Sequence, residues 1–272
     1  MLNNVVMGQY YPVDSTVHRL DPRIKLVMTV IFIVAVFMAH SFAGYLLLLA
    51  FLVFACRMSR VPFRFLLKGL KPLRFIIIIT FLLNLFFTPG DDVWISFWII
   101  RITREAFLQA LFYSLRLVFL VAGTSLLTLT TSPIALSDGI EMLLSPLKVI
   151  HFPAHELAMM MTIALRFIPT LLEETDKIMK AQMARGADFE SGNILVRAKS
   201  MVPLLVPLFV SAFRHAGDLA MAMESRCYHG GEGRTRLRVL KTTKQDWIAL
   251  GVVLLLLALI ILEGVFLKGV LF

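Results

Sequence analysis

The stretch that decides the fold runs from Leu165 to Tyr228 and reads LRFIPTLLEETDKIMKAQMARGADFESGNILVRAKSMVPLLVPLFVSAFRHAGDLAMAMESRCY. Two long amphipathic helical patterns fill it, separated by a polar turn at 188–193. Each pattern ends in an arginine beside small residues, and the two triplets are Ala184-Arg185-Gly186 and Ser225-Arg226-Cys227. Such a stretch is typical of a part of a membrane protein that extends into water and contacts another protein.

The composition indicates an integral membrane protein. Hydrophobic residues make up 58% of the 272 residues, including 22 Phe and 14 Met, whereas soluble domains contain about 45–50%. The mean hydropathy is +0.82. The net charge of +9 comes from Lys and Arg in blocks beside hydrophobic segments, which follows the positive-inside bias and argues against nucleic acid as a partner.

Hydrophobic segments predict an all-α fold with about five transmembrane helices, at 24–39, 42–56, 73–87, 106–129 and 247–267. Asp21 can cap the first of these helices, with Pro22 at its first position. A cationic block separates the second and third spans and consists of Arg57, Arg60, Arg64, Lys68, Lys71 and Arg74. This block predicts a cytoplasmic amino terminus and a loop near anionic lipid headgroups.

The chain is therefore expected to have three parts. Residues 1–131 form an amino-terminal arm and four spans, residues 132–245 a cytoplasmic region with two long amphipathic helices, and residues 246–272 the last span. The helical pattern from His155 to Gly186 would extend for about 48 Å. It is not a simple span, because Glu173, Glu174, Asp176, Lys177 and Lys180 fill its second half.

Both amphipathic patterns carry an apolar face with many methionines, whose soft side chains can repack against different partners. We select as candidate contacts for a partner Met161, Ile168, Leu172, Met179, Met183, Leu205, Phe209, Ala212 and Met223. An alternative is that these helices lie flat in the headgroup layer.

The two arginine triplets also permit two interpretations. Arg185 followed by Gly186 is what an ordinary helix end contains, because a cation favours the negative end of the helix dipole and glycine supplies the cap. The recurrence at Arg226 favours a second interpretation, in which both guanidinium groups bind carboxylates in acidic grooves of a partner.

Several chemistries lack the residues they need. Residues 230–235 are glycine-rich but have neither the lysine nor the spacing of a nucleotide-binding loop. His151 and His155 are separated by Pro153, and Met159 stands where a second histidine of H-E-x-x-H would be, so no metal site is expected. Arg116 lies inside a predicted span without an evident partner. An alternative function is a lipid-modifying enzyme that binds substrate phosphate with the cationic block.

The sequence resembles the transmembrane T subunit of energy-coupling factor vitamin transporters over nearly its whole length. The resemblance rests on the arm at residues 14–25, on both arginine triplets, and on Tyr228-His229-Gly230. The second triplet departs from the family's pattern, which often has Ala-Arg-Gly there.

The resemblance implies a non-catalytic subunit in the plasma membrane of a prokaryote. Its partners would be two ABC-type ATPases, which bind ATP and Mg²⁺, and a small membrane-embedded substrate-binding subunit. Arg185 and Arg226 would each occupy a groove of one ATPase, and the apolar faces would hold the substrate-binding subunit. The cargo would be a vitamin or a metal, and this chain would bind no cofactor of its own.

Overall fold

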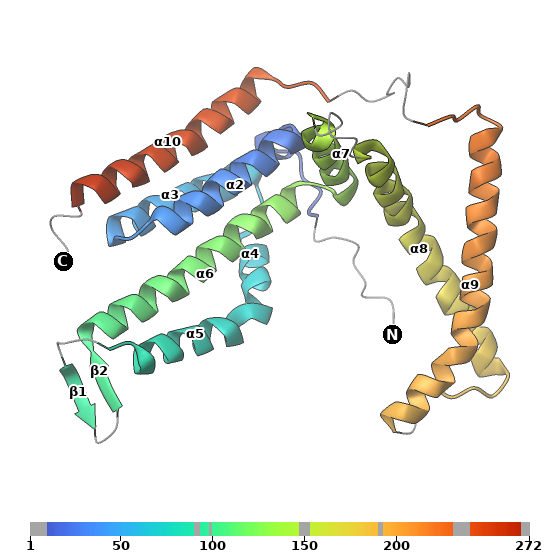
Figure 1. Cartoon of the computed structure of the whole chain (residues 1–272), viewed down its shortest axis with the longest axis horizontal. Coiled ribbons are helices and arrows are strands. Elements are labelled where there is room, and N and C mark those ends of the chain that lie inside the picture. Colours follow the sequence, from blue (N-terminus) through green and yellow to red (C-terminus); the bar gives the residue numbers. More distant parts are fainter. Residues whose placement is uncertain are drawn as a thin grey trace. The chain divides into compact units, whose positions relative to one another are not determined.

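The computed structural model describes residues 10–89, 93–97, 100–146, 153–189, 193–230 and 240–267. Its elements are α1 (Thr16–Arg19), α2 (Pro22–Met38), α3 (Phe42–Ser59), α4 (Phe63–Leu70), the 3₁₀ turn η1 (Lys71–Leu73), α5 (Arg74–Phe87), β1 (Val93–Phe97), β2 (Ile100–Thr103), α6 (Arg104–Thr130), α7 (Pro133–Leu144), α8 (Ala154–Ala184), α9 (Ile194–Glu224) and α10 (Lys244–Leu267) (Figure 1). Helices dominate the described residues, so the predicted all-α class is confirmed.

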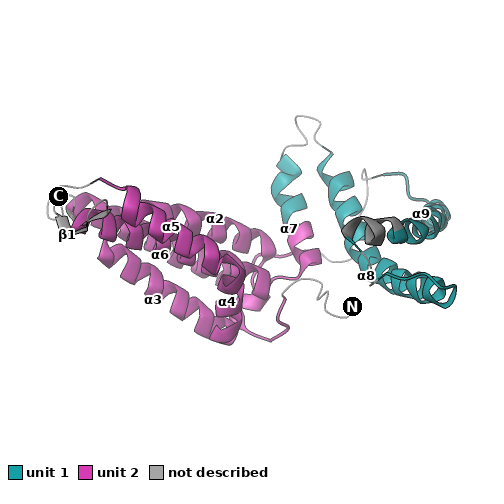
Figure 2. Ribbon diagram, turned by 90° about the horizontal axis from the view of Figure 1, so that it is seen from below, with its two compact units in different colours: residues 1–7, 140–239 teal, residues 8–139, 240–272 magenta. Residues whose placement is uncertain are grey.

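Contacts divide the chain into two compact units (Figure 2). The membrane unit comprises the described residues of 8–139 and 240–272, and the arginine-tip unit comprises those of 140–239. The functional assignment of 132–245 as a cytoplasmic region stays a prediction.

The five predicted spans coincide with α2, α3, α5, α6 and α10. Among the described residues, six helical stretches are long and apolar enough to cross a membrane, judged by length and composition only. They are Phe42–Ser59, Phe63–Phe87, Arg104–Thr130, Ala154–Ala184, Ser200–Glu224 and Lys244–Phe266. The chain is therefore a multi-pass membrane protein. By this criterion α8 and α9 qualify as well, whereas α2 has 17 residues.

The core of the membrane unit lies between α2, α3, α6 and α10, and includes Phe32, Leu48, Phe119 and Ile260. Helix α6 approaches α2 closely at Gly123, where a Cβ atom would lie 2.3 Å from the Phe32 ring. The small and hydroxyl residues at 122–125 predict close helix packing in this span, and the contact at Gly123 confirms it.

A short β-hairpin joins α5 to α6 and was not predicted. Strands β1 and β2 pair antiparallel, with Ile95 opposite Ile102 and Phe97 opposite Ile100. The sequence predicted an external loop here, with Trp94 and Trp98 in an interfacial aromatic belt. Trp98 and the turn at 90–92 lie outside the described residues, so that prediction remains open.

In the arginine-tip unit, α8 and α9 pack against each other. The Ser211 hydroxyl donates to Glu174, the other Glu174 oxygen lies 3.4 Å from His215 Nε2, and the His215 ring stacks on Phe167 at 5.9 Å between centroids. Helix α8 confirms the predicted pattern from residue 155. The second amphipathic pattern predicts a helix from about Leu204 to Tyr228. That start is wrong, because α9 begins at Ile194 and continues through two prolines.

Candidate functional site

The end of α8 is a Schellman motif built around Arg185. The Gly186 N–H donates to the Met183 carbonyl and the Ala187 N–H donates to the Gln182 carbonyl, each at 3.0 Å. Gly186 has a φ of +88°, a left-handed conformation that glycine adopts without steric cost. Arg185 is therefore the C-cap residue, and its backbone is fixed by the helix end itself.

The end of α9 repeats this hydrogen-bonding pattern. The Cys227 N–H donates to the Glu224 carbonyl at 2.9 Å, and the Tyr228 N–H donates to the Met223 carbonyl at 3.1 Å. Cys227 occupies the position equivalent to Gly186 and has a φ of +56°. Arg226 is thus the C-cap of its helix, like Arg185, and the departure at Cys227 leaves the backbone geometry of the motif intact.

Both triplets are exposed at every residue, 184–186 and 225–227. Among the described residues, no carboxylate lies within ion-pair distance of the Arg185 or Arg226 guanidinium. Two permanently charged groups, each able to bind a carboxylate with two parallel hydrogen bonds, are thus held out in solvent.

The two arginines lie equally far along their helices from the contact between α8 and α9. The contact is made by Glu174 of α8 and His215 of α9. Arg185 follows Glu174 by 11 residues (185 − 174), and Arg226 follows His215 by 11 residues (226 − 215). At 1.5 Å per residue, each tip is about 16 Å along its helix axis from this contact. The arrangement presents the same group at the same reach on each helix.

The predicted apolar contact residues divide into two groups by exposure. Met161, Ile168, Met183, Leu205 and Phe209 are exposed, whereas Leu172, Met179, Ala212 and Met223 are half-buried.

The structure also reveals an exposed apolar stripe on α9 that sequence reasoning located only in part. Its members recur every three or four residues and are Met201, Val202, Leu205, Val206, Phe209, Val210 and Phe213. The most exposed member of the stripe is Phe213, at 75%. The period of 3.6 was visible in the sequence, and Leu205 and Phe209 were predicted, but a helix starting at residue 204 leaves out Met201 and Val202.

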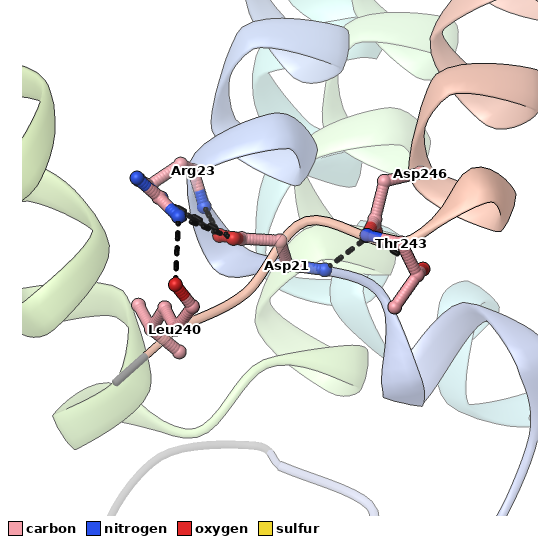
Figure 3. Close-up of polar contacts among 5 residues, drawn as sticks. All are labelled: Asp21, Arg23, Leu240, Thr243 and Asp246. Carbon is pink, nitrogen blue, oxygen red and sulfur yellow. Dashed lines mark hydrogen bonds and ion pairs between the residues drawn. The ribbon is translucent and has the colours of Figure 1, made fainter. Parts of the chain in front are cut away.

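The start of the membrane unit is fixed by a buried polar cluster between the first and last spans (Figure 3). The Asp21 N–H donates to Asp246 Oδ1 at 2.8 Å, while Asp246 Oδ2 accepts from the Thr243 N–H at 2.6 Å and from the Thr243 hydroxyl at 2.8 Å. Asp246 is 1% exposed. Asp246 therefore satisfies the N–H of the residue before α10, which is one half of a capping box, and also the N–H of the residue before α2.

Asp21 caps α2 as predicted, accepting from the Arg23 N–H at 2.9 Å. The Arg23 guanidinium donates to Asp21 Oδ2 at 2.8 Å and to the Leu240 carbonyl at 3.2 Å (Figure 3). Lys25 is 4% exposed, and its ammonium donates to the carbonyls of His18 and Thr130. Both cations thus contribute to packing within the unit, which their sequence position did not reveal.

Two other sequence candidates acquire structural partners. Arg116 donates to the Ala39 carbonyl at 3.3 Å, and its guanidinium lies over the rings of Phe37 and Tyr113. His155 Nδ1 lies 2.9 Å from Glu141 Oε1. His151 and residues 231–235 lie outside the described residues.

Long apolar helices pack in a bundle, and polar groups between them form hydrogen bonds within the chain. These features define a helical multi-pass membrane protein. The sequence model of the family CbiQ, described as cobalt transport protein, matches residues 14–237. The chain is 53% identical over 266 residues to a protein of Clostridium kluyveri, covering 97% of this chain and 98% of the relative. It is 56% identical over 248 residues to one of Thermosediminibacter oceani (91% and 93%) and 50% identical over 260 residues to one of Bacillus subtilis (96% and 98%).

All three relatives are named energy-coupling factor transporter transmembrane protein EcfT. The chain belongs to this family, and it is a transmembrane component of an energy-coupling factor transporter. The resemblance found in the sequence is thereby confirmed at the level of the family.

Proposed function

We propose that this chain is the non-catalytic coupling subunit of its transporter. It transmits ATP hydrolysis in two partner ATPases to a small membrane-embedded subunit that binds the substrate. The ATPases hold ATP and Mg²⁺, and the cargo is a vitamin or another micronutrient such as a metal ion. The amino terminus and the arginine-tip unit face the cytoplasm, in agreement with the distribution of Lys and Arg.

One observation carries the proposal. Arg185 and Arg226 cap their helices in the same motif, are exposed, and lie at equal reach from the contact between α8 and α9. Two equivalent cationic tips on one chain suit two equivalent acidic grooves, one on each of two similar partner subunits. Movement of either partner would then act on a helix that is already joined to the other at Glu174 and His215.

The exposed apolar stripe on α9 supports the second contact. A row of side chains such as Phe209 (62% exposed) and Phe213 (75% exposed) is costly in water and suits burial against an apolar partner. We assign this stripe, with the exposed methionines of α8, to the substrate-binding subunit. The arginine tips and these apolar side chains thus contact different partners. Because both lie on the same helices, force applied at the tips can reach the substrate-binding subunit.

The tips are tested by charge reversal. Arg185→Glu together with Arg226→Glu is expected to lower the amount of ATPase that co-purifies with the tagged chain at least tenfold, and to abolish ATP-dependent uptake. Loss of a desolvated charge pair typically weakens binding by about 2–5 kcal/mol.

The matched control is Arg166→Glu with Arg214→Glu, which changes the same charge at exposed positions on the same two helices. This control should keep its ATPases. Intact co-purification by the tip variant, or equal loss by both variants, would contradict the proposal.

No observation favours the lipid-modifying enzyme considered from the sequence. The relatives are named as transporter membrane proteins, which supports the non-catalytic assignment. Turnover of a phospholipid by the purified chain alone would reverse it.

A further inference from the structure

Helix α4 has one face packed within the membrane unit. Leu66 is 5% exposed and belongs to a buried cluster with Cys56, Val61 and Leu129. A Cβ atom on Gly69 would lie 2.8 Å from the Ser125 hydroxyl of α6. Phe65 packs on Tyr11 of the amino-terminal arm, with ring centroids 4.9 Å apart. These contacts fix the orientation of α4, and they therefore decide which of its side chains point away from the unit.

That opposite face carries four exposed cations around a shallow hollow. Arg64, Lys68 and Lys71 follow one another at intervals of four and three residues, so they share one side of the helix. Arg74 stands at the start of α5. Together with Leu67 and Leu70 they line a hollow of about 470 Å³.

These four charges have no carboxylate to neutralise them. The sequence contains no Asp or Glu between Asp21 and Asp91. None of the four cations forms an ion pair within the described residues. Lys68 lies over the Phe65 ring at 5.0 Å, which holds its ammonium in place without cancelling its charge. Like charges three and four residues apart repel one another, so an anion in the hollow would relieve this repulsion.

The surroundings of the hollow indicate what kind of anion it takes. Helix α5 starts at Arg74 and buries none of its residues within the chain, and Phe75 is 69% exposed and Phe87 79% exposed. Around the hollow, exposed Phe63 and Leu67 lie among the cations. A surface that alternates apolar and cationic side chains at the end of an apolar helix matches the boundary between headgroups and acyl chains.

We propose that α4 and η1 form a discrete binding site for the headgroup of an anionic phospholipid. The phosphate lies between Arg64, Lys68, Lys71 and Arg74, and Leu67 and Leu70 contact the start of the acyl chains. Bound lipid fixes the α4–α5 corner at the membrane surface. These four cations thus bind one headgroup at a fixed position, in addition to the general attraction of cationic residues to an anionic bilayer.

The test uses the full chain with its co-purifying partners in nanodiscs that contain equal amounts of phosphatidylglycerol and phosphatidylcholine. Lipid retained after detergent extraction is counted by native mass spectrometry. Each cation near an anionic surface contributes about fivefold in affinity. Lys68→Gln with Lys71→Gln should therefore reduce the retained phosphatidylglycerol by roughly tenfold or more.

Two further variants keep the test specific. Lys241→Gln with Lys244→Gln removes the same charge from exposed positions elsewhere in the membrane unit and should leave retention nearly unchanged, because neither lysine lines the hollow. Lys68→Arg with Lys71→Arg should retain phosphatidylglycerol, which shows that the Gln variant loses charge and not fold. Equal loss in both Gln variants, no preference for phosphatidylglycerol in the unmodified chain, or displacement of the lipid by inorganic phosphate would overturn the proposal.

Discussion

Two pairs of cationic side chains, one in each unit, have opposite surroundings in this protein. In the membrane unit, Lys25 is almost fully buried and donates to backbone carbonyls, and the Arg23 guanidinium donates to the Asp21 carboxylate. In the arginine-tip unit, Arg185 and Arg226 are exposed and have no carboxylate partner among the described residues. The first pair holds helices of the same chain together, and the second is available to other chains.

The buried apolar side chains are also divided unequally between the two units. The two buried hydrophobic clusters of the described residues both lie in the membrane unit. Among the described residues of the arginine-tip unit, the buried hydrophobic ones are Ala154, Ala158 and Leu204, while large side chains such as Phe209 and Phe213 are exposed. Exposed apolar patches of this kind are typical of surfaces that contact a partner or the bilayer.

The largest effect is expected where the membrane unit is held by buried charge. Asp246→Ala removes the acceptor of the Asp21 N–H and of two Thr243 donors, and buried donors without a partner are costly. We expect the free energy of unfolding to fall by about 3 kcal/mol, measured by thermal unfolding in detergent. Asp218→Ala, at an exposed position of α9, should change it by less than about 0.5 kcal/mol. Equal effects would remove the contrast between the units.

A smaller effect distinguishes the two tips, which share a motif but differ in its left-handed residue. Cys227→Gly should stabilise the end of α9 by about 0.5–1 kcal/mol, because glycine adopts a positive φ without strain. Gly186→Ala should destabilise the end of α8 by about 1 kcal/mol for the converse reason. Hydrogen exchange at the capping amides measures both changes. Cys227→Ala is the control and should be neutral, since alanine keeps the Cβ atom.

The smallest effect concerns the amino-terminal arm of the membrane unit. His18 Nε2 lies 2.9 Å from the Tyr11 carbonyl and Nδ1 lies 2.7 Å from the Ser15 hydroxyl. A carbonyl only accepts, so Nε2 carries the proton and the Ser15 hydroxyl donates to Nδ1. Burial, and secondarily the charge of Lys25, lower the pKa of His18 below its ordinary value of 6.5.

The sign of the pH dependence follows from this lowered pKa. Below about pH 6.5 the unfolded arm binds more protons than the folded arm, so the contribution of His18 to stability is present above that pH and declines as the pH falls further. Limited proteolysis of the arm between pH 7.5 and 5.5 should show faster cleavage at the acidic end. His18→Gln should weaken this dependence, and an unchanged profile in that variant would contradict the role of His18.

Much of the fold was predictable because the bilayer restricts what a chain can do. Spans at 24–39, 42–56, 73–87, 106–129 and 247–267 match helices within a few residues, since long apolar runs must form helices there. The start of α9 was missed because Pro203 is locally unfavourable in a helix, and the helix continues through it all the same. The β-hairpin was missed because strands of five and four residues give too short a pattern.

The candidate site was predictable in its residues but not in its geometry. Both arginine triplets could be found because they recur after two helical patterns. The equivalent backbone geometry of the two triplets could not be predicted, because it depends on hydrogen bonds that place Cys227 in the left-handed conformation of Gly186. The hydrogen-bond acceptor of Arg116 was likewise hidden, since the Ala39 carbonyl is 77 residues away in the chain.

The sequence by itself determined the class of protein, the positions of the spans and the two arginines at the helix ends. These properties depend on composition and on periodicities of a few residues, which are local. Tertiary structure alone decided which cations are buried, which face of α9 is exposed, and that Asp21 and Asp246 meet across the chain. Those properties depend on packing between distant segments. Packing decides whether a charged side chain is buried, where it makes structural contacts, or is left exposed, where a partner can bind it.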